Sequence, residues 1–111
     1  MIGTITCGEL SCETVYAVTW GARLHGLHCY THGDMEHRQL LLRPCRGVHT
    51  YGMKYALDIA FLNRDNEVLR VMRRVRPQRI VWGPLNTHSV IERSACPGAW
   101  YKVKDRLEET I

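Results

Sequence analysis

Two apolar runs joined by a short polar turn constrain the fold of this chain more than any other feature. The first run spans residues 57–62 and the second residues 67–75, with Asn63-Arg64-Asp65-Asn66 between them. Large apolar side chains occupy every second position of the first run, which is the period of a β-strand. A run, a turn of polar residues and a second run predict a β-hairpin over residues 57–75.

Other short runs of β-branched and aromatic residues lie on both sides of this hairpin. We expect strands at residues 2–7, 14–20, 39–42, 80–82 and 89–91, with a turn at 8–13 that pairs the first two. We also expect a short helix or turn at 21–28, a polar loop at 31–37 and a short charged tail at 107–111. Many short strands separated by turns predict an all-β sandwich or barrel rather than βαβ units.

Length and composition allow one such domain. The chain has 111 residues, of which 45% are hydrophobic, and this suffices for one core within a single domain, 1–111. No apolar run approaches the roughly 18 residues of a transmembrane helix. The first twenty residues carry no Lys or Arg ahead of an apolar stretch, and the five cysteines include no CxxC pair. We therefore expect a reduced cytoplasmic protein without a secretory signal.

The segment RPCRGVHTYGMKYALDIAFLNRDNEVLRV, residues 43–71, resembles a prokaryotic family known as domain of unknown function 192. The matching positions are Cys45, His49, Thr50, Met53, Asp58, Phe61, Leu62 and Asp65, and a weaker likeness extends from about residue 20 to residue 107. The resemblance implies a compact, mostly β, jelly-roll-like domain, and with it we expect a β-sandwich or barrel that has one or two short helices. Family members are often exported, and no reaction is established for them. Lys104-Asp105 stands where the family has a Gly-Asp pair.

The matching segment holds a cysteine and a histidine that could act together. Cys45 and His49 flank a tight connection, and a neighbouring imidazole can convert a thiol into a thiolate nucleophile. Against this catalytic interpretation, four residues of regular strand separate two side chains by about 13 Å. The structural alternative, which we favour, has Cys45 as a small buried hydrophobe and His49 bonded to the loop backbone.

Asp58 interrupts the apolar run YALDIAFL. A carboxylate there must be exposed, paired or hydrogen-bonded, because burying it alone costs several kcal/mol. The candidate partners are Arg46, His49, Thr50 and Lys54, and we expect Asp58 to pair with the loop of His49. Such a pair would be either a polar clasp that fixes the loop, which we favour, or one wall of a ligand pocket.

A second polar cluster, HxxHCxxHxxxxH, contains His25, His28, Cys29, His32 and His37. It offers more nitrogen and sulfur ligands than the four that zinc takes, but its spacing matches no zinc finger or ribbon. The two interpretations are a solvated polar loop, which we favour, and a site for zinc or another transition metal. The sequence predicts no other cofactor.

Five arginines, Arg70, Arg73, Arg74, Arg76 and Arg79, lie in and just after the second run of the hairpin. They could bind an anion, but arginines on an edge strand also deter pairing with other chains. Without an RNP-type aromatic motif, a helix-turn-helix or a glycine-rich phosphate loop, the sequence disfavours nucleic acid as a partner. Tyr51, Trp82, Trp100 and Tyr101 are candidates for a ligand platform, although the core needs most of the aromatic residues.

These features favour a small ligand-binding or accessory module over an enzyme. Its candidate site consists of Arg46, His49, Thr50 and Asp58, and its partner would be a small ligand or a protein. The alternative is a small enzyme. Its catalytic candidates are Cys45, His49 and Asp58, or the histidine cluster would hold the metal of a hydrolase.

Overall fold

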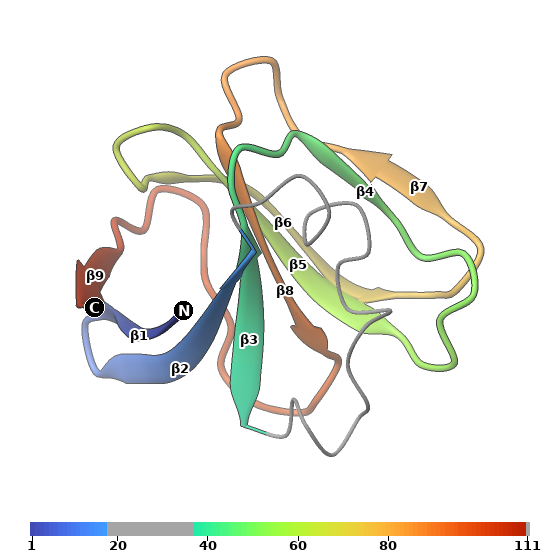
Figure 1. Ribbon diagram of the computed structural model, residues 1–111, viewed down its shortest axis with the longest axis horizontal. Coiled ribbons are helices and arrows are strands. Elements are labelled where there is room, and N and C mark those ends of the chain that lie inside the picture. The colour runs from blue at the N-terminus through green and yellow to red at the C-terminus, as the bar shows by residue number, and fades with distance from the viewer. Residues whose placement is uncertain (18–36, 111) are drawn as a thin grey trace.

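The computed structural model describes residues 1–17 and 37–110, which form nine β-strands and no helix. The strands are β1 (Ile2–Cys7), β2 (Leu10–Ala17), β3 (Arg38–Leu42), β4 (Gly47–His49), β5 (Leu57–Leu62), β6 (Val68–Val75), β7 (Ile80–Trp82), β8 (Ser89–Ser94) and β9 (Glu108–Thr110). Seven of them form one curled sheet in the order β6-β5-β8-β3-β2-β1-β9, while β4 and β7 form a separate two-stranded sheet (Figure 1). The prediction of a mostly β fold of the barrel or sandwich kind is confirmed.

Neighbouring strands are antiparallel except for β2 and β3, which are parallel. The predicted hairpin over residues 57–75 is present as β5 and β6, and β6 is one of the two edge strands of the large sheet. Its register has a bulge at which Asp58 alone stands opposite Arg73 and Arg74. Arg74 has a φ of 54°, the left-handed conformation that a bulge residue often adopts.

Apolar side chains cover both faces of the central strands β5, β8 and β3. On one face the largest members of the cluster are Phe61, Leu40, Leu42, Leu57 and Ile59, and Val48 and Val81 pack against them from β4 and β7. On the other face the cluster contains Ile5, Leu41, Leu62 and Ile91, which Trp100, Tyr101 and Leu107 cover from the segment after β8. Because β5 is sandwiched in this way, all six of its residues are buried, including the charged Asp58.

The ends of two predicted elements differ from the structure. β2 begins at Leu10, four residues earlier than expected, so its turn with β1 is much tighter. Residues 107–111, predicted as a charged tail, contribute β9, which pairs with β1. The middle residue of β9, Glu109, accepts hydrogen bonds from Tyr16, Arg43 and Asn66. A three-residue polar strand has no hydrophobic periodicity, so the sequence pattern does not reveal it.

The predicted short helix or turn at 21–28, the loop at 31–36 and the end of the second strand at 18–20 lie outside the described residues. Within the described ranges, no helix has the length and apolar character needed to cross a bilayer.

Candidate functional site

Asp58 is fully buried and lies at the centre of a hydrogen-bonded ion cluster. Arg93 donates from Nε to Oδ2 over 2.9 Å, and Arg73 donates from Nε to Oδ1 over 3.4 Å. The backbone N–H groups of Arg74 and Cys96 donate to the same carboxylate at 3.1 and 3.4 Å. Burial by itself raises the pKa of Asp58, but the hydrogen bonds from Arg74, Arg93 and Arg73 outweigh it and hold the pKa below its usual value. The buried group is therefore a carboxylate.

This cluster carries more positive than negative charge. One carboxylate is shared by the guanidinium groups of Arg73 and Arg93, which leaves one positive charge in excess. The Arg73 side chain is 41% exposed and is screened by water, whereas the Arg93 side chain is only 15% exposed. The uncompensated charge therefore acts mainly at Arg93.

The indole of Trp100 lies against the guanidinium of Arg93. Cζ of Arg93 is 4.4 Å from the ring centroid, and Trp100 Nε1 donates a hydrogen bond to the carbonyl of Ile59, which fixes the ring. Nη2 of Arg93 is buried and has no hydrogen-bond partner among the described residues. A buried donor without an acceptor costs free energy, and side chains cover this one even on the cavity side.

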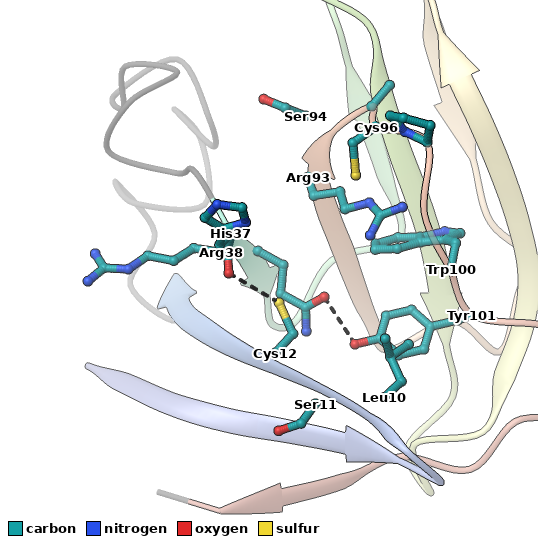
Figure 2. A pocket seen from close by; sticks show the side chains of 13 residues that line it. Leu10, Ser11, Cys12, His37, Arg38, Arg93, Ser94, Cys96, Trp100 and Tyr101 are labelled. Atoms are coloured by element: carbon teal, nitrogen blue, oxygen red, sulfur yellow. Dashed lines mark hydrogen bonds between the residues drawn. The ribbon is translucent and has the colours of Figure 1, made fainter.

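A cavity of about 600 Å³ opens beside Arg93 and Trp100 (Figure 2). Its walls come from β2, the start of β3, the end of β8 and the segment that follows β8. On one wall Tyr101 donates from its hydroxyl to Gln39 Oε1 over 3.0 Å, and Gln39 Nε2 donates to Thr14 Oγ1 over 3.0 Å. The polar groups of that wall are thus bonded to one another, which leaves Arg93 as the charged group with an unused donor.

Two thiols, those of Cys12 and Cys96, line the same cavity. Burial raises the pKa of Cys12, and the opposing effect of Arg93 is smaller. Cys12 Sγ also lies 3.8 Å from the carbonyl oxygen of His37, as a weak donor. Because the thiolate is the nucleophilic form of cysteine, a raised pKa makes Cys12 a poor nucleophile. The cavity offers a cation, aromatic rings and the thiols of Cys12 and Cys96.

Of the four ligand residues that the sequence predicts, Asp58 alone lies in the ion cluster beside this cavity. Its predicted pairing with the loop of His49 is wrong: the hydrogen bonds of the carboxylate go to β6, β8 and the backbone of Cys96. The reason is geometric. The bulge in β6 turns the N–H of Arg74 toward Asp58, and Arg93 stands directly opposite on β8.

The other three predicted residues lie on or near β4. Thr50 is buried, and its hydroxyl donates to the carbonyl of Arg76 over 2.7 Å and accepts from the N–H of Arg79 over 2.9 Å. Thr50 therefore joins the end of β4 to the connection between β6 and β7. His49 and Arg46 are exposed at the surface.

Cys45 packs against the first apolar cluster, and its thiol donates to the carbonyl of Gly47 over 3.1 Å. This arrangement agrees with the structural interpretation of Cys45 as a small, half-buried hydrophobe.

The predicted metal ligands His25, His28, Cys29 and His32 lie outside the described residues, and His37 lies directly before β3. Within 1–17 and 37–110, no three His, Cys, Asp or Glu side chains are placed to share a metal ion. A metal site on the histidine cluster stays a prediction.

Sequence reasoning missed Arg93 and Cys12 as pocket residues. Trp100 and Tyr101, which the sequence offers as platform candidates, do line the cavity. The signal for Arg93 is weak, because it depends on aligning β8 with β5 so that Arg93 comes to stand opposite Asp58. A period-2 pattern indicates faces, but it does not show which strands are neighbours.

Comparison with known proteins places the fold but not the activity. No family model matches the chain, and no curated protein matches it. A protein of unknown function from Novosphingobium aromaticivorans DSM 12444 has a similar structure, with a TM-score of 0.75, 18% identity, and coverage of 97% of this chain and 84% of that one. A putative transcription regulator from Sinorhizobium meliloti 1021 is also similar, with a TM-score of 0.72, 19% identity, and coverage of 97% and 91%. At these identities the likeness shows a shared fold alone.

Proposed function

We propose that this protein is a small ligand-binding module whose pocket takes an organic anion with a flat apolar body. The observation that carries the proposal is the guanidinium of Arg93, held 4.4 Å from the Trp100 ring beside a cavity of about 600 Å³. Pockets of this size are typical of small-molecule sites, which combine apolar walls with a few directed polar groups.

The charge of the ligand follows from the ion cluster. Asp58 neutralises only one of the two guanidinium groups that it binds, and Nη2 of Arg93 has no acceptor among the described residues. A carboxylate or similar anion beside the guanidinium of Arg93 would supply the missing negative charge. A second cation would meet the excess positive charge and bind poorly.

The apolar part of the ligand follows from the walls. Trp100, Tyr101 and Leu10 line the cavity with two rings and an aliphatic side chain, and the Tyr101 hydroxyl is already bonded to Gln39. A flat ring system would contact these rings without competing for their hydrogen bonds.

The same geometry supports binding over thiol catalysis at this pocket, because burial raises the pKa of Cys12. An enzyme that uses Cys45 with His49, or a metal on the histidine cluster, stays the alternative proposal. Its support is the sequence spacing alone.

We also propose a cytoplasmic protein of prokaryotic origin with a jelly-roll-like fold. The described cysteines form no disulfide with one another, and both similar structures come from bacteria. Membership of the family known as domain of unknown function 192 stays a prediction from residues 43–71.

The proposal is tested by calorimetric titration with benzoate, phenylacetate and indole-3-carboxylate, each against its neutral amide. We expect the carboxylates to bind about tenfold more tightly than the amides, since one charge-assisted hydrogen bond accounts for that difference. Cys12→Leu places a larger apolar side chain in the cavity, leaves the residues of the ion cluster unchanged, and should weaken binding. Thr4→Leu, a half-buried strand position outside the cavity, is the matched control. Equal affinity for acids and amides, no binding by any of them, or unchanged binding by Cys12→Leu would overturn the proposal.

A further inference from the structure

The outer face of the two-stranded sheet β4–β7 is apolar and open to solvent. Val48 and Val81 point inward against the core, so the alternate residues point outward. Among these, Ile80 is 56% exposed and Trp82 is 59% exposed, and His49 lies beside them on β4. This sheet packs against the core cluster on one face of the large sheet, whereas Trp100 and Tyr101, which line the Arg93 cavity, cover the other face.

The rings on this face are held in place by the fold. Trp82 stands opposite Gly47, and its ring lies so close to that glycine that an added Cβ would fall 2.3 Å from the indole. The strand backbone thus supports one face of the indole. The ring of Tyr51, which is 46% exposed, lies 5.9 Å from that of His49. Between them these residues line a groove of about 340 Å³ together with Ile80.

Positive charge surrounds the groove. The chain segments that build this part of the molecule, residues 43–57 and 68–91, contain eight Lys and Arg residues and no Asp or Glu. Two of the eight, Arg43 and Arg73, are paired with Glu109 and Asp58 away from the groove. Arg46 and Arg79 are exposed directly beside β4 and β7. Arg70 donates from Nη1 to the carbonyl of Trp82 over 2.9 Å, which brings a third guanidinium to the groove.

We propose that this face docks an acidic segment of a protein partner, which places one bulky apolar side chain in the groove and its carboxylates on Arg46, Arg70 and Arg79. Charge complementarity selects the partner, because the rim is basic without an acidic residue in either segment. Exposed Trp and Tyr with flanking Arg have the composition of a protein-interface hot spot.

A single-stranded nucleic acid would also meet aromatic rings and positive charge. The groove fits it less well, because Ile80 lines it beside the rings and an aliphatic side chain is no stacking platform for a base. The acidic peptide uses both the aliphatic and the aromatic walls. The proposal is independent of the Arg93 pocket, so either can fail without the other.

The test is selection from a displayed library of random peptides at physiological salt, followed by fluorescence anisotropy with the selected peptide. We expect enrichment of Trp, Phe or Leu flanked by Asp and Glu. Trp82→Ser and Ile80→Ser should each weaken binding about tenfold or more, and Arg79→Glu should weaken it and reduce its salt dependence. Val103→Ser and Lys102→Glu, which change exposed residues elsewhere, are the matched controls and should bind as the unaltered protein does.

Three results would overturn the proposal. The first is a selection that enriches no acidic peptide, or acidic peptides without an apolar anchor. The second is binding that Trp82→Ser and Ile80→Ser leave unchanged while circular dichroism shows both variants folded. The third is a single-stranded oligothymidylate that binds more tightly than the selected peptide and loses affinity with the same variants.

Discussion

Arg93 and Asp58 face each other directly across the antiparallel strands β8 and β5, and Arg93 Nε donates to Asp58 Oδ2 over 2.9 Å. The carboxylate is inaccessible to solvent, so protein groups supply its hydrogen bonds. The pair therefore links the stability of the sheet to the cavity, because the guanidinium that neutralises Asp58 is also the one that lies against Trp100.

Asp58→Asn should destabilise the fold by roughly 3 kcal/mol, because it leaves a buried guanidinium without its counter-charge. Arg73→Met removes the more exposed partner of the same carboxylate and should cost about 1 kcal/mol or less. Urea unfolding at neutral pH measures both. If Asp58→Asn lost less stability than Arg73→Met, this account of the cluster would be contradicted.

The same cluster should make the stability of the fold depend on pH in the acidic range. The pKa of Asp58 is lower in the folded protein than its ordinary value of 3.8, so the carboxylate stabilises the fold above that pH. Its contribution is lost as the pH falls through the folded pKa. Urea unfolding measures the free energy of unfolding of the unaltered protein and of Asp58→Asn between neutral and acidic pH. We expect the difference between the two free energies to become smaller as the pH falls. A difference that stays constant would contradict the assignment.

Glu92 should give the stability of the fold the opposite pH dependence, at higher pH. It lies on β8 between Leu40 and Ile59, is 3% exposed, and burial raises its pKa from 4.5 to about 7. The unfolded chain releases this proton near pH 4.5 while the folded chain keeps it, so stability should fall as the pH rises from about 4.5 to 7 and level off above. The total loss is on the order of 3 kcal/mol.

Glu92→Gln should remove that loss. We expect the variant to be more stable than the unaltered protein at pH 8 and to have no such advantage at pH 5, in urea unfolding at both values. Glu108→Gln, an exposed position on β9, is the matched control and should change neither value. An advantage of Glu92→Gln that is the same at both pH values would show that the carboxyl does not titrate in this window.

The hydrophobic pattern of single strands predicts much of the fold. It does not predict the site, because the site depends on which strands pair and in which register. The hairpin at 57–75 and the run at 89–91 are visible as alternating apolar residues around turn residues. Asp58 could be predicted to need a partner, but Arg93 is 35 positions away and meets it only because β8 inserts between β5 and β3. The contacts of Glu109 could not be predicted either. Its hydrogen bonds to Tyr16 and Arg43 depend on β9, a short polar strand without hydrophobic periodicity.

Lys104 offers a test of a position that the family resemblance singles out. It stands where the family has glycine, and its φ is 80°, the left-handed region that side chains with a Cβ adopt at a cost of about 1–2 kcal/mol. Lys104→Gly should therefore raise stability by roughly 0.5 kcal/mol after the greater freedom of glycine in the unfolded chain is subtracted. Lys102→Gly, where no positive φ is present, should lower it. Thermal unfolding measures both, and a loss for Lys104→Gly would contradict the prediction.

Gly47→Ala tests how Trp82 is seated. An added methyl would fall 2.3 Å from the indole, so the Trp82 ring would have to move away from Gly47 on β4. We expect a loss of about 1–3 kcal/mol in urea unfolding, the usual range for overpacking, together with a shift of the Trp82 indole signal in NMR spectra. Adding Trp82→Ser should remove most of the extra penalty, since the three atoms nearest to the added methyl all belong to that ring. If Gly47→Ala costs the same with and without the indole, the two residues are not coupled as the structure has them.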